Sequence, residues 1–227
     1  MQQPSYDSAT TTRATPPWQL TGSGWVVLYR FPRAFVRDYG LIPDHLAGTF
    51  RGGIGAVMMI DYRTSPVGPY RELLFIPGVF RHGRRKYYAV TKIYVSSLDS
   101  VVNGRENWGI PKSVAEFQIT QESESTQRFE AAVNGELFFS AALESGILRF
   151  PVNTRVNPFP PTLLQQHDDG RLLATTPQLG GTISVTGTVL EMAVAGRHFP
   201  DVSAFKPAGL LELVKMRLYF PIPKVIS

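Results

Sequence analysis

Short runs of β-branched and aromatic residues, each ended by glycine, proline or a polar turn, dominate this sequence. The 227 residues include 20 Gly and 18 Pro, and no long amphipathic helical pattern separates the runs. This pattern is typical of strands joined by tight turns, because β-branched and aromatic side chains fit a pleated surface while glycine and proline favour turns. With 43% hydrophobic and 18% charged residues, the chain can bury a substantial core.

The apolar runs predict strands over residues 25–30, 54–62, 70–80, 86–95, 114–120, 127–133, 136–143, 172–176, 182–192 and 210–220. The strands between residues 54 and 95 are expected to form an antiparallel meander, and Asn134-Gly135 is the strongest hairpin signal. Short helices are predicted over 33–39 and from the cap candidate Ser97 towards Trp108. The sequence therefore predicts a mainly β (α+β) fold, a large curved antiparallel sheet or barrel that encloses a cavity, with a few short helices.

The first residues differ in composition from the rest of the chain. Residues 1–16 are rich in Ser, Thr and Gln and predict a disordered tail, while residues 17–227 are predicted to form a single domain. The tail lacks the basic start and apolar run of a signal peptide, and no later stretch approaches the roughly 20 apolar residues of a membrane span. A cytoplasmic protein with no membrane partner is expected.

The formal net charge is +5 and the sequence pI is near 9.6. Positive charge concentrates only at residues 81–86, in a glycine-containing turn between two β-patterned runs. A solvated hairpin tip is favoured over a nucleic-acid surface, since loop tips are where unpaired charge is least costly. We expect a small-molecule partner and a homo-oligomer, with no nucleic acid bound.

Several kinds of catalytic site are disfavoured by the residues present. The chain has no Cys, which excludes thiolate nucleophiles and cysteine-ligated metals. Its four histidines have no ligand-like spacing, so neither a metal nor another cofactor is expected; they are His45, His82, His167 and His198. The Gly22-Ser23-Gly24 segment precedes a strand instead of following one, which argues against a serine-hydrolase nucleophile elbow.

The segment 104–113 reads Gly-Arg-Glu-Asn-Trp-Gly-Ile-Pro-Lys-Ser and leads from a turn into Lys112 at the start of a strand. It resembles the acetoacetate decarboxylase-like family, which carries a Gly-Arg-Glu run shortly before a Pro-Lys pair. Tyr70-Arg71-Glu72 is similar to the family's Tyr-x-Glu, and residues 93–95 resemble the strand before the Gly-Arg-Glu helix. Residues 25–30 and 41–46 resemble the family's opening elements, so the likeness covers most of residues 24–120 in order.

The resemblance implies a function and a set of site residues. Lys112 would form a Schiff base with a keto acid, and a β-keto acid decarboxylase is the leading hypothesis. An aldolase-dehydratase or cyclase of secondary metabolism and a non-catalytic small-molecule-binding protein are the alternatives. Glu72 is the candidate for proton transfer. Substrate contacts are expected from Tyr70, Tyr94, Arg105, Trp108 and Ile110.

Lys112 can attack a carbonyl only as a neutral amine, and a lysine with a reference pKa of about 10.4 is almost fully protonated at pH 7. Two departures from the family bear on this. Ser113 follows Lys112 where the resembled decarboxylases have a second lysine, and no arginine stands near Thr21 to pair with the glutamate. Burial against apolar walls, and not a neighbouring ammonium, is therefore predicted to lower the pKa of Lys112.

Overall fold

The computed structural model describes residues 11–156, 161–185 and 187–226, and within these residues the strands form three sheets. The eight-stranded sheet contains, in spatial order, β12 (Arg149–Asn153), β15 (Gln178–Ser184), β17 (Gly209–Phe220), β1 (Trp18–Tyr29), β3 (Gly55–Thr64), β4 (Tyr70–Ile76), β7 (Lys92–Val95) and β8 (Lys112–Val114). The four-stranded sheet contains β16 (Thr188–Val194), β11 (Glu136–Glu144), β10 (Thr126–Val133) and β9 (Glu116–Gln121). The six-stranded sheet contains β18 (Lys224–Ile226), β14 (Leu172–Thr175), β13 (Leu163–Gln166), β6 (Arg85–Tyr88), β5 (Val79–His82) and β2 (Phe50–Gly52).

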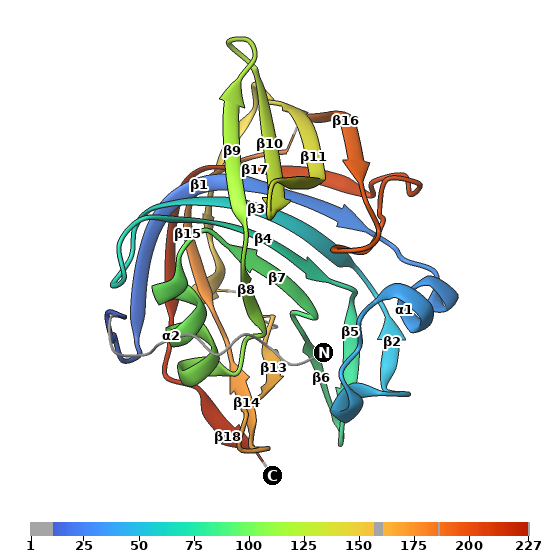
Figure 1. The fold of residues 1–227 in the computed structure, drawn as a ribbon, viewed down its shortest axis with the longest axis vertical. Helices are drawn as coiled ribbons and strands as arrows, with labels where there is room; N and C mark the ends of the chain where they lie inside the picture. The colour runs from blue at the N-terminus through green and yellow to red at the C-terminus, as the bar shows by residue number, and fades with distance from the viewer. Residues whose placement is uncertain (1–10, 157–160, 186, 227) are drawn as a thin grey trace.

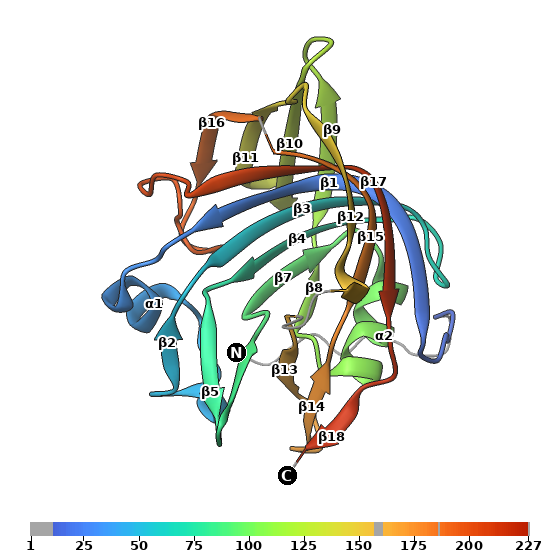
Figure 2. The ribbon, with the colours of Figure 1, turned by 180° about the vertical axis from the view of Figure 1, so that it is seen from behind.

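The eight-stranded sheet is strongly curved, and its two faces have different neighbours. Figures 1 and 2 show it as an arch, with the four-stranded sheet on the convex side and helix α2 (Leu98–Trp108) with β13 and β14 beneath the concave side. Most strand pairs are antiparallel, whereas β7 pairs with β8 and β6 pairs with β13 in parallel. The predicted mainly β fold with a large curved sheet and a few short helices is confirmed.

The alternation of side chains along the strands creates two cores. Val27, Val57 and Leu73 point to the convex side, where they pack with residues of the four-stranded sheet such as Phe139. Their neighbours in the chain point the other way, and Leu74 belongs to the cluster on the concave side. Successive strand residues face opposite sides of a sheet. The strands that contribute to the core on the convex side therefore also contribute apolar side chains to the concave side.

The predicted antiparallel meander and the Asn134-Gly135 hairpin are present, but the strand predicted over 86–95 is two strands, β6 and β7, which belong to different sheets. β3 pairs with β4 and β4 with β7, both antiparallel. Asn134 and Gly135 have φ values of 52° and 75° between β10 and β11, the left-handed pair that a tight hairpin turn requires. The basic residues 81–86 lie in the hairpin of β5 and β6.

The helices begin and end close to the predicted positions. α1 covers Arg33–Tyr39, and short 3-10 helices, η2 and η3, cover Asp44–Leu46 and Thr154–Val156. In α2, the side chain of Ser97 accepts a hydrogen bond from the backbone N–H of Ser100, as expected for a serine cap. Gly109 ends this helix in the left-handed conformation. No helix in the described ranges is long and apolar enough to cross a membrane.

Some predicted boundaries differ from the structure. The strand predicted over 70–80 ends at Ile76, because Pro77 removes a hydrogen-bond donor and Gly78 takes a φ of 142° before β5 begins. The strand predicted over 182–192 is two strands, β15 and β16, which belong to different sheets. The short strands β12 and β13 were not predicted, since neither has a regular alternation of apolar and polar residues.

Residues 11–16 differ from the predicted disordered tail, of which residues 1–10 lie outside the described part. The backbone N–H of Ala14 donates a 2.8 Å hydrogen bond to the Asn103 side chain, and Asn103 in turn donates to the carbonyl of Thr12. The Asn107 side chain donates to the carbonyl of Ala14. The segment is therefore held on α2 by asparagine side chains, a long-range contact that composition alone does not encode.

Candidate active site

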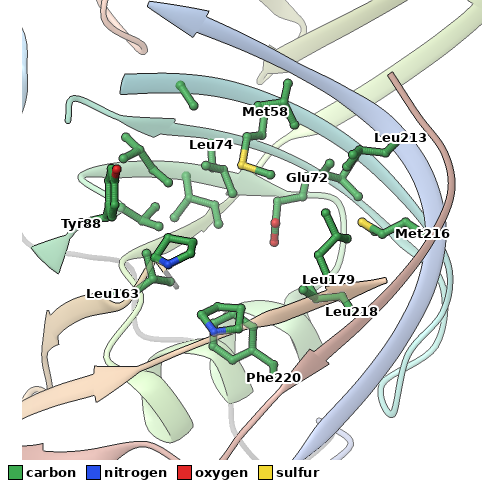
Figure 3. Close-up of a pocket in the computed structure, with 18 of the residues that line it drawn as sticks. Met58, Glu72, Leu74, Tyr88, Leu163, Leu179, Leu213, Met216, Leu218 and Phe220 are labelled. Atoms are coloured by element: carbon green, nitrogen blue, oxygen red, sulfur yellow. The ribbon is translucent and has the colours of Figure 1, made fainter. Parts of the chain in front are cut away.

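A cavity of about 470 Å³ lies on the concave side of the eight-stranded sheet. Its walls are apolar side chains from most strands of that sheet, together with residues of α2 and of the six-stranded sheet. Figure 3 shows the Glu72 carboxylate directed into this space among Met58, Leu74, Leu213 and Met216. A volume of this size is typical of small-molecule sites.

Lys112 is placed in the cavity wall by its surroundings in the chain. It is the first residue of β8 and is only 5% exposed. The Arg105 side chain on α2 donates a 2.8 Å hydrogen bond from Nε to the Lys112 carbonyl oxygen. The aliphatic part of Lys112 lies against Gly104, where a Cβ atom would come within 2.6 Å of Lys112 Cδ. The Gly-Arg pair of the sequence motif thus positions the lysine through backbone and packing contacts.

The amine of Lys112 is bound by two buried side chains. Its Nζ donates to Glu72 Oε2 at 3.0 Å and to Ser100 Oγ at 2.9 Å. Glu72 is 5% exposed, Ser100 is fully buried, and Nζ lies 5.0 Å from the centre of the Tyr70 ring. The result is a desolvated ion pair in an apolar cavity, joined across β7, the strand between β4 and β8.

Two tyrosines complete the surroundings of the ion pair. Tyr62 donates a 3.2 Å hydrogen bond to Glu72 Oε1, so each oxygen of this carboxylate has a donor. Burial raises the pKa of Tyr62 well above its usual value, and burial raises the pKa of Tyr70 to about 12. Both hydroxyls therefore stay protonated near neutral pH, and that of Tyr62 donates to the carboxylate.

Burial lowers the pKa of Lys112 as predicted, but neighbouring groups that raise this pKa outweigh the effect of burial. Burial is the largest influence and lowers the pKa of Lys112, yet the Glu72 carboxylate and Tyr70 together raise that pKa above its usual 10.5. The net prediction of a lowered pKa was therefore wrong, because the sequence did not show that Glu72 contacts the amine. With its pKa raised, the Lys112 amine is an ammonium near neutral pH.

The structure brings some of the predicted site residues together and separates others. Tyr70, Trp108 and Ile110 line the cavity with Lys112 and Glu72. Tyr94 does not: its hydroxyl donates to the His198 carbonyl on the convex side, because it is adjacent in β7 to the cavity residue Ile93 and faces the opposite way. Arg105 is absent from the cavity wall and instead holds the Lys112 backbone.

Ser100 and Tyr62 are contacts of the ion pair that sequence reasoning missed. Tyr62 pairs directly with Tyr70 across β3 and β4, so the predicted antiparallel meander could have placed it beside Glu72. Ser100 lies on α2 one turn before Gly104, the face that packs on Lys112, a relation visible only once the helix and β8 are docked. The described residues hold no group of three or more His, Cys, Asp or Glu side chains suited to a metal ion.

The fold is shared with solved structures of known enzymes. Acetoacetate decarboxylase from Legionella pneumophila superposes with a TM-score of 0.70 and 14% identity, covering 100% of this chain and 98% of that one. The fold and the motif around Lys112 thus define a protein of the acetoacetate decarboxylase type. The sequence model of the acetoacetate decarboxylase (ADC) family matches residues 2–160, and the chain belongs to this family.

Curated relatives are similar over less than half of the chain. Protein NEOXANTHIN-DEFICIENT 1 from Oryza sativa subsp. japonica is 26% identical over 106 residues, which cover 47% of this chain and 35% of that protein. Decarboxylase DEC1 from Cochliobolus heterostrophus is 27% identical over 103 residues, 45% of this chain and 39% of that protein. The matches thus span little more than a third of the relatives' own length.

Proposed function

We propose that this protein is a lyase that forms a Schiff base between Lys112 and a keto acid, with decarboxylation of a β-keto acid as its leading reaction. The observation that carries the proposal is the buried Lys112–Glu72 pair, with a 3.0 Å contact, in the wall of an apolar cavity. Membership of the acetoacetate decarboxylase family and the likeness to Decarboxylase DEC1 support it.

The geometry supplies the groups that imine formation needs. Glu72 accepts the proton of Lys112 through their hydrogen bond, and the neutral amine attacks the ketone carbon. Glu72 then returns the proton to the departing hydroxyl, so that water leaves and a protonated imine forms. The Lys112 ammonium is thus replaced by a protonated imine, Glu72 is again a carboxylate, and the net charge of the pair does not change.

Decarboxylation follows from that imine. The electron pair of the bond to the carboxylate moves towards the imine nitrogen, carbon dioxide leaves, and a neutral enamine remains. Glu72, after taking a proton from solvent, protonates the enamine carbon, and water hydrolyses the new imine to release the ketone and Lys112. The overall reaction consumes one proton for each keto acid. An apolar wall favours the bond-breaking step, because it solvates the substrate carboxylate poorly while the transition state spreads that charge.

The same enamine could attack a second carbonyl compound, as in an aldolase-dehydratase or a cyclase. The observation that favours this alternative is the cavity volume of about 470 Å³, which leaves room for a second reactant beside a short keto acid. Product analysis separates the two: release of carbon dioxide from a β-keto acid supports decarboxylation, whereas imine formation without carbon dioxide supports condensation.

Borohydride trapping tests the proposal directly. Incubation with a panel of keto acids and sodium borohydride should produce a stable secondary amine on Lys112, because hydride reduces the protonated imine at carbon. Peptide mass spectrometry locates the adduct. The partly buried Lys92 on the convex side of the sheet is an internal comparison. Labelling of surface lysines without Lys112, or no labelling by any member of the panel, would overturn the proposed function.

Gly104→Ala should slow imine formation at Lys112 without a large loss of thermal stability. Alanine in a helix interior is favoured over glycine by about 1 kcal/mol, but its Cβ would lie 2.6 Å from Lys112 Cδ and 2.8 Å from Cε. Lys112 is bound at its tip and cannot move without losing Glu72 or Ser100. We expect imine trapping to slow by a factor on the order of 10², with a small change in thermal stability.

The matched control is Gly196→Ala, whose Cβ would meet only Asp201 Cβ, at 3.7 Å. Rates of borohydride trapping and thermal unfolding curves are measured for both variants. Full trapping activity in Gly104→Ala would show that the lysine does not depend on this contact.

A further inference from the structure

We infer that the cavity accepts a carbonyl compound with a long apolar chain, and that this chain, and not a carboxylate, provides most of the binding. The inference rests on the proposed function, since it concerns the compound that Lys112 attacks. It is carried by three observations on the cavity: its volume, its extent along the strands, and the absence of a second cationic side chain among the described residues of its wall.

The cavity is much larger than a short keto acid requires. Acetoacetate has seven non-hydrogen atoms and would take up roughly 200 Å³ even at the approximately 30 Å³ that liquid water uses per molecule. The cavity holds about 470 Å³. A four-carbon acid would leave more than half of an apolar space unfilled, with neither the substrate nor well-bound water to contact its walls.

The unfilled space extends away from the ion pair along the sheet. On β4 the cavity residues continue from Glu72 to Ile76, and Ala56 on β3 lies directly opposite Ile76. Strand residues are spaced about 3.3 Å apart, so this end of the cavity lies roughly 13 Å beyond Glu72. That distance matches an extended chain of about eight or more carbon–carbon bonds of about 1.5 Å each.

Lys112 is the only cationic side chain among the described residues that line the cavity. The residues outside the described part cannot add another, because residues 1–10, 157–160, 186 and 227 include no Lys, Arg or His. Lys112 is already paired with Glu72, and the Tyr62 hydroxyl already donates to the same carboxylate. The wall therefore offers a substrate carboxylate no cation of its own.

An added carboxylate should consequently weaken binding or leave it unchanged. Moving an ionised carboxylate from water into an apolar cavity is costly unless a cation or several donors receive it. Each buried methylene, in contrast, strengthens binding about fourfold. A chain that fills the space between Glu72 and Ala56 thus offsets the poor solvation of any charged group near Lys112.

The test measures the ketone concentration that gives half-maximal borohydride trapping on Lys112 for the methyl ketones from 2-butanone to 2-undecanone. We expect it to fall by at least 10² between 2-butanone and 2-nonanone, at about fourfold per methylene. Acetoacetate should need a higher concentration than 2-undecanone. A change of less than tenfold across the series, or stronger trapping by acetoacetate, would overturn the inference while leaving the proposed function in place. Absence of any adduct on Lys112 would overturn both.

A cavity-filling variant locates the chain. Ala56→Phe places a ring at the end of the cavity far from Glu72 and should raise the half-maximal concentration of 2-undecanone at least tenfold, with 2-butanone changed less than twofold. Ala193→Phe adds the same ring at an exposed position of β16 and should change neither. If Ala56→Phe does not fold, Leu28→Trp fills the same end, since Leu28 pairs with Ala56 and also lines the cavity. Equal loss for both ketones would overturn this placement.

Discussion

Lys112→Met should lower turnover by a factor on the order of 10⁴ or more, because the variant keeps an unbranched side chain of similar length but has no amine to form the imine. Borohydride trapping should disappear at the same time. The rate is measured with whichever keto acid in the panel gives the strongest trapping of the wild-type protein. Activity within tenfold of wild type would remove Lys112 from the reaction.

Lys92→Met is the matched control for this variant. Lys92 is a partly buried lysine on β7, the strand that pairs with β8, and its amine lies 4.5 Å from the Tyr94 ring on the convex side. The same substitution there removes one positive charge from the sheet without touching the cavity. Unchanged turnover in Lys92→Met shows that the loss in Lys112→Met comes from the nucleophile and not from net charge or strand stability.

Lys112→Met should also destabilise the fold by about 3–5 kcal/mol, because it leaves Glu72 buried without its cation. The folded-state pKa of Lys112 is raised, so the stabilisation by the pair is complete below the unfolded pKa of about 10.5 and is lost as pH rises through the folded pKa. Denaturant unfolding near pH 7 therefore measures the intact pair. The double variant Lys112→Met/Glu72→Gln should recover most of the loss, since it leaves no unpaired charge.

Local sequence signals were sufficient for the parts of the fold that short-range chemistry determines. The Ser97 cap, the Asn134-Gly135 turn and the β3–β4–β7 meander each follow from residues close together in the chain. The sheet order could not be predicted in this way. In the eight-stranded sheet β17 lies between β15 and β1, although β1 and β17 are far apart in the sequence. Long-range pairing depends on which apolar faces meet, and many strands here offer similar faces.

The candidate site, like the fold, could be predicted only in part. The resemblance to the acetoacetate decarboxylase family indicated Lys112, Glu72 and Tyr70, and all three line the cavity. The wall contributed by β17, including Leu213, Met216 and Phe220, was not anticipated. Nor was the net effect on Lys112, because a pKa depends on the distance to one carboxylate as much as on burial, and a sequence motif contains no distances.

Glu72→Gln should slow the two halves of the reaction, imine formation and enamine protonation, to different extents. Burial is the largest influence on the Lys112 amine, and Glu72 is the main group that opposes it. Without the carboxylate, burial dominates and lowers the pKa of Lys112, so a larger fraction of the amine is neutral near pH 7. The neutral amine then no longer needs Glu72 to remove its proton, although the loss of water still lacks its proton donor. Imine trapping by borohydride at this pH should therefore fall less than complete turnover, and its dependence on pH should move to lower pH.

Complete turnover should nevertheless fall by a factor on the order of 10² to 10⁴, because glutamine cannot give a proton to the enamine carbon. Tyr62→Phe is the control: it removes a hydrogen bond to Glu72 but keeps the carboxylate, so trapping and turnover should change together and by less than tenfold. Unchanged turnover in Glu72→Gln would show that Glu72 only positions the Lys112 amine and transfers no proton. If trapping and turnover instead fall equally, Glu72 is needed to take the proton from Lys112, and the first step, not the enamine step, depends on this carboxylate.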